Sequence, residues 1–189
     1  MDSRSDPQSH RGFTLLELIT VMAIAGILAS VAVPSYRYIA QTNRIAAEIN
    51  GLLGDLQFAR SEAIKEGQTV TVCQSTDGAT CTVGTSWNKG WIVFQDPNSS
   101  QSVGTGENIL RVQTGFTGTD TFAANNTISA ISFNREGFAV ANGTGLTGGN
   151  ALLTLHSLPL NPDATRCLSL NSIGMTTVQT AKNSGGTCT

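Results

Sequence analysis

One carboxylate near the start of the chain stands inside an apolar run, where a charge is costly. Glu17 lies within residues 13–33, whose other members are apolar, small or hydroxyl-bearing. An ionised carboxylate in such surroundings is stable only if it stays near water or gains a cationic partner. Glu17 is therefore either a charge tolerated near a membrane interface, close to the positive end of a helix dipole, or half of an ion pair with a cationic group.

Four cysteines form the second set of residues with chemistry of their own. Cys73, Cys81, Cys167 and Cys188 all follow the apolar run, on the side that we expect to be exported to an oxidising compartment. Four cysteines allow three pairings, and we favour Cys73–Cys81 and Cys167–Cys188 because each closes a polar, glycine-containing loop. Zinc is the alternative, but there is no Cys-x-x-Cys and His156 is the only histidine after the apolar run.

Nothing in the sequence assembles a catalytic centre. His156 sits in an alternating strand pattern, and no Ser/His/Asp or Cys/His arrangement has a local signature. Residues 143–148 match Gly-x-Gly-x-x-Gly, but a dinucleotide site needs a preceding strand, a following helix and a later acidic residue. A β-patterned run follows instead, so these residues are expected to form a loop. We expect no catalytic residue, no cofactor and no metal.

Composition limits the size and the class of the protein. The 189 residues suffice for one domain with an appendage, and the abundant Gly, Ser, Thr and Asn suit a β-rich domain with many turns. The net charge is −2, only 13% of residues are charged, and no basic run occurs. This balance argues against an electrostatic nucleic-acid binder.

The N-terminal region predicts a membrane-inserted start. Residues 1–12 are polar and carry Arg4, His10 and Arg11, and residues 13–33 are long enough to span a bilayer as a helix. A secretory signal would have a shorter apolar region followed by a small-residue cleavage site. The basic residues before the run favour a cytoplasmic N-terminus, with the remainder outside the membrane.

The helical pattern continues past the apolar run to about residue 66. Pro34 should kink or loosen the helix, because it removes one backbone donor. Beyond it, apolar residues recur at spacings of four and three, the pattern of an amphipathic helix. The apolar positions are Ile45, Ile49, Leu52, Leu56, Ala59 and Ala63, and the charged positions expected on the other side are Arg44, Glu48, Asp55, Arg60 and Glu62. Gly67 supplies a helix end, so the helix would be about 80 Å long.

Short alternating or apolar runs after residue 67 predict β-strands. They cover residues 69–73, 91–94, 109–112, 128–133, 138–140, 151–158, 166–170 and 175–178, with a hairpin turn at 134–137. Segments 75–90, 96–107, 115–127 and 142–150 are rich in Gly, Asn, Ser and Thr and are predicted loops. The sequence therefore predicts an α+β fold in which one long N-terminal helix packs on an antiparallel β-sheet head.

Several of these motifs resemble those of one family. Residues 12–17, Gly-Phe-Thr-Leu-Leu-Glu, followed by an apolar run and Pro34, resemble the class III signal of type IV pilins and type II secretion pseudopilins. Residues 56–64, Leu-Gln-Phe-Ala-Arg-Ser-Glu-Ala-Ile, are similar to the FimT/FimU/GspH branch. Further similar stretches are 70–73, 91–94 with Asp96, 131–133 with Gly137, and 166–170 with Gly174. The resemblance covers nearly the whole chain.

The resemblance implies a processing step and a location. A prepilin peptidase would cleave between Gly12 and Phe13 and N-methylate Phe13. Residues 1–12 would be the leader, 13–35 a transmembrane and assembly helix, and 36–189 a periplasmic head. The protein would wait as a single-pass protein of the bacterial inner membrane. It would then join a pilus or pseudopilus, with other minor and major pilins or pseudopilins as partners.

The resemblance also gives Glu17 a partner. Cleavage would expose a cationic amine on Phe13, with which Glu17 of a neighbouring subunit can pair in a low-dielectric bundle. A wrong register would leave a buried charge unpaired, so Glu17 would fix the assembly register. Gly26 and Pro34 bracket a segment that either loses helicity in a filament or is kinked for structural reasons only. The Cys167–Cys188 loop would resemble the C-terminal disulfide loop of pilins.

The resemblance implies a minor pilin of the FimT/FimU kind, which helps to prime pilus assembly or forms part of the tip complex. Two cysteine pairs favour the pilus over the alternative, a GspH-like minor pseudopilin of type II secretion. A third hypothesis is a DNA receptor for transformation, because FimT-like proteins that capture DNA carry Gly-Arg-x-Arg near the C-terminus. Residues 174–177 here are Gly-Met-Thr-Thr, and Arg166 and Lys182 are the only basic residues nearby, so DNA binding is disfavoured.

Overall fold

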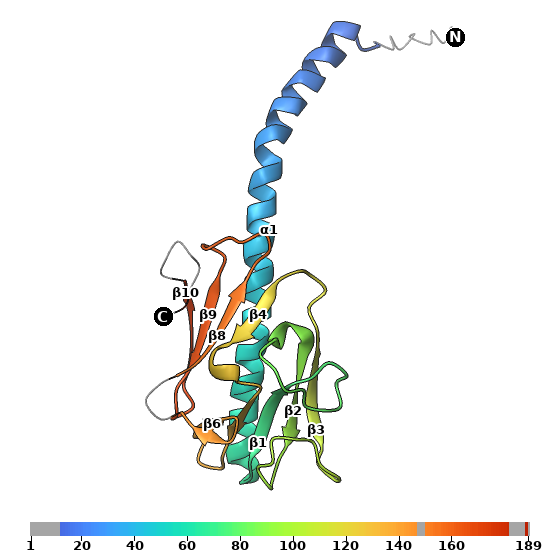
Figure 1. The fold of residues 1–189 in the computed structure, drawn as a ribbon. Helices are drawn as coiled ribbons and strands as arrows, with labels where there is room; N and C mark the ends of the chain where they lie inside the picture. The colour runs from blue at the N-terminus through green and yellow to red at the C-terminus, as the bar shows by residue number, and fades with distance from the viewer. Residues whose placement is uncertain (1–11, 147–149, 182–187, 189) are drawn as a thin grey trace, which may run out of the picture. The chain divides into compact units, whose positions relative to one another are not determined.

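The computed structural model describes residues 12–146, 150–181 and 188. Two compact units divide the chain, Met1–Ala40 and Gln41–Thr189, and the second is called the head here. The structure has the predicted α+β organisation, with one long helix followed by ten strands in the described part of the chain (Figure 1).

Helix α1, Leu15–Glu66, contains all but the first two residues of the predicted helix. It runs through Pro34 without interruption, so the proline does not break the helix, and a kink there stays a prediction. The helix ends where the sequence indicates. Gly67 has a φ of 69°, and its N–H donates to the carbonyl of Ala63 at 3.0 Å. This is a left-handed cap, which glycine adopts without the steric cost of a Cβ.

The first unit contributes only the early part of α1 to the described structure. Every described residue from 12 to 40 is exposed, although most of them are apolar. A helix that is apolar on all sides needs an apolar surrounding, either lipid or other helices. Nothing within residues 12–40 supplies one.

The head contains a six-stranded sheet in the order β3-β2-β1-β5-β6-β7. Strand β1, Val70–Gln74, lies near its centre, and Val72 stands opposite Val93 on one side and Ile131 on the other. All neighbouring strands are antiparallel. The remaining strands of this sheet are β2 Gly90–Gln95, β3 Ile109–Thr114, β5 Ala130–Phe133, β6 Ala139–Ala141 and β7 Thr144–Gly145.

The second sheet of the head has four antiparallel strands in the order β10-β9-β8-β4. They are β4 Thr121–Ala124, β8 Ala151–His156, β9 Arg166–Leu170 and β10 Thr176–Thr180. The sequence predicted strands at or near eight of the ten observed positions, but it placed β4 and β7 in loops.

The missed strand β4 shows why composition misled the prediction. Among its four residues only Phe122 is buried, and segment 115–127 around it is rich in Gly, Thr and Asn. The strand exists because Phe122 enters the core and its backbone pairs with β8, opposite Leu155. Two short 3-10 helices, Trp87–Lys89 and Asn125–Thr127, also lie in predicted loops.

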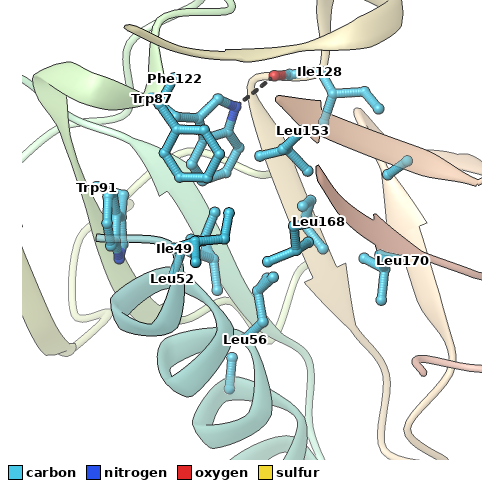
Figure 2. Packing of buried hydrophobic residues seen from close by; sticks show 14 of the residues in the cluster. Ile49, Leu52, Leu56, Trp87, Trp91, Phe122, Ile128, Leu153, Leu168 and Leu170 are labelled. Atoms are coloured by element: carbon cyan, nitrogen blue, oxygen red, sulfur yellow. Dashed lines mark hydrogen bonds between the residues drawn. The ribbon is translucent and has the colours of Figure 1, made fainter. Parts of the chain in front are cut away.

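The core lies where α1 meets both sheets. The helix residues that are buried in the head are the six predicted ones, Ile45, Ile49, Leu52, Leu56, Ala59 and Ala63. Figure 2 shows Ile49, Leu52 and Leu56 between Trp91 of the first sheet and Leu168 and Leu170 of the second. This stripe of α1 is therefore the surface that joins the two sheets.

Two tryptophans and two phenylalanines fill the space beside the stripe. Trp91 makes edge-to-face contacts with Phe116 and Phe122, whose own rings are stacked 6.2 Å apart. Trp87 is fully buried, and its indole N–H donates to the carbonyl of Ile128 at 3.0 Å (Figure 2). The polar atom of this large side chain is thereby satisfied inside the core.

Replacing Leu52 should test the role of the stripe. Leu52→Ala should lower the free energy of unfolding by about 2–5 kcal/mol, because it removes a buried side chain and leaves a cavity. Urea unfolding of the full chain in detergent micelles, followed by tryptophan fluorescence, measures this loss. Asn50→Ala, on the exposed side of the same turn, is the matched control and should change little. A loss for Leu52→Ala no larger than that for Asn50→Ala would contradict the assigned core.

Candidate processing and assembly site

The residues that precede and begin α1 form a defined helix start. The hydroxyl of Thr14 accepts a hydrogen bond from the backbone N–H of Glu17 at 3.2 Å, and its carbonyl accepts one from Leu18 at 3.2 Å. Thr14 is therefore the N-cap of α1. The spacing Thr-x-x-Glu is that of a capping box, a local signal for a helix start that the apolar pattern does not reveal.

Glu17 lies in the first turn of α1 and is exposed. The N-terminus of a helix favours a negative charge, so the first turn partly stabilises the carboxylate. Its side chain makes no hydrogen bond or ion pair with any residue that the structure describes. The cation expected from the sequence belongs to another molecule, so the intersubunit pair stays a prediction.

Gly26 and Pro34 both lie inside the continuous helix. A Cβ at Gly26 would have no atom within 4 Å among the described residues, so packing within the chain does not require glycine there. The loss of helicity between these two residues in a filament stays a prediction.

Helix α1 is also long and apolar enough to cross a membrane. Its most apolar window of 18 residues has a mean hydropathy of 2.3 and lies near the N-terminus, with none of it buried. This agrees with the predicted membrane-inserted start by length and composition. The basic residues Arg4, His10 and Arg11 of the expected leader lie outside the described residues.

The four cysteines form two disulfides in the head. Cys73 is joined to Cys81, with 5.6 Å between their Cα atoms, and Cys167 is joined to Cys188, with 5.7 Å. Both distances are usual for disulfides. The first closes a loop at the end of β1, and the second ties the C-terminal region to β9. This is the pairing favoured from the sequence.

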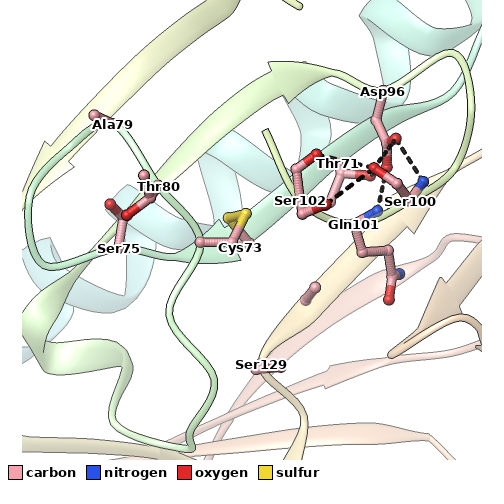
Figure 3. Close-up of a disulfide and its surroundings, with 12 residues drawn as sticks. Thr71, Cys73, Ser75, Ala79, Thr80, Asp96, Ser100, Gln101, Ser102 and Ser129 are labelled. Carbon is pink, nitrogen blue, oxygen red and sulfur yellow. Dashed lines mark hydrogen bonds between the residues drawn. A yellow bond between two sulfur atoms is a disulfide. The ribbon is translucent and has the colours of Figure 1, made fainter. Parts of the chain in front are cut away.

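A buried carboxylate near the first disulfide fixes the connection after β2. Asp96 accepts hydrogen bonds from the hydroxyl of Thr71 at 2.7 Å and from the backbone N–H groups of Ser100 and Gln101 at 2.8 and 3.0 Å (Figure 3). Gln101 also donates to Ser132 at 2.7 Å. These contacts satisfy the buried charge, so Asp96 has a structural role in the head.

The positions of the charged residues of α1 differ from those expected from the sequence. They were expected on the side of the helix opposite the apolar stripe, but several contact the sheets. Arg44 binds Asp120 through two hydrogen bonds of 2.6 and 2.9 Å. Asp55 pairs with Arg111 of β3 at 2.9 Å and accepts a hydrogen bond from the Trp91 indole at 2.8 Å.

The two sheets explain this difference. They flank the helix, so positions on both borders of the apolar stripe meet side chains from strands and loops. Arg60 donates to the carbonyl of Gly174 at 3.2 Å. Glu62 pairs with Lys65 at 2.8 Å on an exposed part of the helix.

Among these charged helix residues, Glu48 has the weakest contacts with hydrogen-bond and ion-pair partners. Its Oε1 lies 4.0 Å from Arg44 Nε, and its Oε2 is buried without a hydrogen-bond partner in the described part of the chain. Burial raises the pKa of Glu48 from 4.5 to about 7, and the nearby charge of Asp120 adds to the effect, whereas Arg44 opposes it. The carboxyl group therefore titrates near neutral pH.

The other residues considered from the sequence do not form a reactive cluster. His156 is a half-buried side chain of β8, and burial lowers its pKa. Among residues 12–146, 150–181 and 188, no group of three His, Cys, Asp or Glu side chains could hold a metal ion. Residues 147 and 148 of the rejected glycine-rich pattern lie outside the described residues.

The turn between β9 and β10 occupies the positions compared with the DNA-binding motif. Gly174 has a φ of 76°, and the backbone N–H of Asn171 donates to the carbonyl of Met175 at 3.1 Å. The nearby Arg166 is bound to the carbonyl of Asp163 at 2.7 Å, and Lys182 lies outside the described residues. The turn therefore presents Met and Thr side chains where the motif has arginines.

Two family models match this chain. Residues 48–174 match the family described as "Type II transport protein GspH". The chain belongs to the GspH family. Residues 7–33 match the "Prokaryotic N-terminal methylation motif". The predicted resemblance to the FimT/FimU/GspH branch is confirmed.

Curated relatives of this GspH-family protein match it over shorter lengths. A "Fimbrial protein" of Pseudomonas aeruginosa is 41% identical over 66 residues, which are 33% of this chain and 40% of that protein. The "Type IV major alpha-pilin" of Moraxella bovis is 37% identical over 79 residues, 40% of this chain and 47% of that protein. The chain thus spans less than half the length of these relatives.

Solved structures match the fold over most of the chain. The type IV minor pilin FimU of Pseudomonas aeruginosa superposes with a TM-score of 0.55 and 19% identity, covering 75% of this chain and 92% of that one. A second crystal form of FimU gives a TM-score of 0.51 with 20% identity and covers 75% of this chain and 94% of that one. The predicted pilin-like fold is confirmed.

The raised pKa of Glu48 predicts how stability depends on pH. The native state holds the Glu48 proton more tightly than the unfolded state, so this group lowers stability as pH rises from about 4.5 to about 7. Glu48→Gln should therefore match the parent protein in melting temperature at pH 4 and exceed it at pH 8. Melting curves recorded by circular dichroism over this pH range measure the difference.

The control for this experiment removes no titratable group. Asn50→Ala, two residues away and exposed, should follow the parent protein at every pH. A gain for Glu48→Gln that is the same at pH 4 and pH 8 would show that Glu48 is not the group responsible.

Proposed function

We propose that this protein is a minor pilin of a type IV pilus that helps to prime assembly or forms part of the tip complex. The observation that carries the proposal is the FimU-like fold, which matches 92% of the FimU chain and follows an N-terminal methylation motif. The match to a fimbrial protein and to a major pilin supports the same class of filament. The role is structural, and it requires no catalytic residue or cofactor.

The proposal includes processing by a prepilin peptidase. Residues 1–12 are removed, and the new N-terminal Phe13 is N-methylated. The methylation motif over residues 7–33 supports this step. Packing gives no reason for glycine at position 12, since a Cβ there would have no described atom within 4 Å. The requirement for glycine then comes from the narrow cleft of the peptidase.

The proposed location follows from the helix. Residues 13–35 hold the protein in the bacterial inner membrane, and residues 36–189 form the periplasmic head. The exposed apolar part of α1 and its length support this division, and the head of the structure begins at Gln41. Other minor and major pilins are the partners, and they cover the apolar helix in the filament.

A second candidate is a minor pseudopilin of a type II secretion system. The observation that favours it is the family model itself, whose description is a type II transport protein. The fold and the methylation motif are expected of subunits of both machines, so these two features do not distinguish the pilus from the secretion system. DNA capture is not part of either proposal, because Met175 and Thr177 stand where the Gly-Arg-x-Arg motif has its arginines.

Deletion of the gene separates the two machines. We expect the deletion strain to lose surface pili and twitching motility while it still releases exoenzymes. Electron microscopy, twitching zones and enzyme assays of the culture supernatant measure these outcomes, with the gene restored on a plasmid as control. Intact pili together with blocked release would assign the protein to secretion. Intact pili with a selective loss of DNA uptake would instead make it a DNA receptor.

The proposed role of Glu17 gives a separate prediction. Glu17→Val should insert and be cleaved normally, yet its incorporation into filaments should fall at least about tenfold, the effect of losing about 1.4 kcal/mol of pairing energy. Immunoblots that compare membrane fractions with sheared filaments measure the ratio.

Two further variants separate the charge from the capping box. Glu17→Gln keeps a side chain that serves at this position of a capping box but removes the charge, so it should fail like Glu17→Val. Thr20→Val removes a polar group one turn later and should incorporate normally. Normal incorporation of Glu17→Gln would show that assembly does not need the charge and would leave Glu17 as a tolerated carboxylate.

A further inference from the structure

The connection from β8 to β9 exposes two leucines at one place on the head. Leu158 is 45% exposed and Leu160 is 54% exposed, with Pro159 between them. Residues 158–160 are called the leucine loop below. A single exposed leucine is ordinary on a protein surface, but two within three residues form a small apolar surface.

Hydrogen bonds hold the backbone of the leucine loop in place. The N–H of Leu158 donates to the buried carboxylate of Asp120 at 3.1 Å. The carbonyl of Pro159 accepts a hydrogen bond from the side chain of Gln41 at 3.0 Å. The two leucines are therefore exposed from a backbone that is tied to the rest of the head.

The bond to Gln41 places the leucine loop at the start of the head. Gln41 is the first residue of the head and follows Ala40 directly in the sequence. Figure 1 shows the connection after β8 beside the beginning of the head part of α1. Ile64 lies near the other end of this part, twenty-three positions after Gln41, which is about 35 Å at the rise of an α-helix.

The residues that precede Gln41 are typical of a membrane–water interface. The apolar run ends at Val33, and Tyr36, Arg37 and Tyr38 follow it. Tyrosine is enriched at the level of the lipid headgroups, because its ring is apolar and its hydroxyl is polar. Tyr38 precedes Gln41 by three positions, which is about 4.5 Å along a helix. The head therefore begins within one helical turn of the expected interface.

The charges near the leucine loop suit an apolar contact with lipid. Residues 158–162 carry no charged side chain. Asp163 follows them, and Nη1 of Arg166 donates to the Asp163 carbonyl at 2.7 Å, so a cation lies beside this acidic residue. Asp120, behind the loop, is paired with Arg44. The loop thus offers apolar side chains with balanced charges around them, which favours insertion between headgroups over electrostatic attraction.

We propose that the leucine loop inserts into the headgroup region of the membrane that holds the apolar part of α1. Leu158 and Leu160 enter the boundary between headgroups and acyl chains, as the apolar side chains of interfacial segments do. The head then has a second contact with the bilayer besides the helix, and this contact limits its tilt before assembly. The inference rests on the proposed membrane location and adds a lipid contact that the proposed function does not include.

Photo-crosslinking to lipid tests this contact with the full chain in vesicles of phosphatidylethanolamine and phosphatidylglycerol. With p-benzoylphenylalanine at Leu160, irradiation should give a lipid adduct, which mass spectrometry detects on the peptide that contains residue 160. The same amino acid at Ile64 is the matched control, because Ile64 is 51% exposed but lies far from the start of the head, and it should give no adduct above background. Equal adduct yields at positions 160 and 64, or crosslinks from position 160 to protein only, would overturn the proposal.

A third position separates failure of this inference from failure of the proposed location. With p-benzoylphenylalanine at Ile24, in the apolar part of α1, a helix that spans the bilayer should give a lipid adduct. An adduct at position 24 without one at position 160 would refute the contact of the leucine loop and leave the membrane location intact. The absence of an adduct at position 24 would refute the membrane location and, with it, the contact.

A substitution within the loop tests whether the leucines drive the insertion. Leu158→Ser should lower the yield of the 160 adduct about three- to tenfold, because one half-exposed leucine no longer favours the apolar phase. Its melting temperature should stay close to that of the parent, since the backbone bond to Asp120 is kept. Ile64→Ser is the matched control and should leave the 160 adduct unchanged. The same adduct yield in Leu158→Ser as in the parent would contradict the insertion.

Discussion

The structure of the head depends on one apolar stripe of α1. Ile49, Leu52 and Leu56 are buried against residues of both sheets, so neither sheet has a complete core without the helix. Among the described residues, no strand of one sheet pairs with a strand of the other. An isolated bridge joins Ser86, in the connection before β2, to Ala123 of β4. The burial of this stripe therefore holds the head together, and a change in helix rotation would expose it on one side or the other.

The charged borders of the stripe fix that rotation. Arg44 binds Asp120 next to the second sheet, and Asp55 binds Arg111 in the first, so each side of the helix is tied to a different sheet. Exposed ion pairs contribute little to stability, but Asp120 is fully buried and accepts two bonds from one guanidinium. A buried Asp120 carboxylate without a cationic partner would lose more stability than the ion pair with Arg44 adds. Helix rotations that move Arg44 away from Asp120 are therefore unfavourable.

The sequence predicted the helix, its buried stripe and most strands because periodicity reports directly which positions face the core. The six buried positions of α1 were found from their spacing alone, and Gly67 marked the helix end. Strand β4 was missed because one buried Phe122 makes no alternating pattern, and its pairing with β8 is a long-range contact. The contacts of the helix charges were missed for a related reason. Periodicity separates apolar from polar positions, but it does not say how far a partner wraps around the helix.

Glu17 and Arg60 have a property that the ion-paired charges of the head lack. Each has a charge set beside exposed apolar side chains, and neither pairs with an opposite charge in the described part of the chain. In the monomer water screens the exposed Glu17 carboxylate, whereas Arg60 is partly buried and its Nε has no acceptor among the described residues. When a neighbouring molecule covers the apolar side chains, water is removed and an unmatched charge becomes expensive. The apolar area then drives association, while the charge allows only the arrangement that brings an opposite charge to it. Together, the apolar area and the charge favour a single register between neighbouring subunits, as an ordered filament requires.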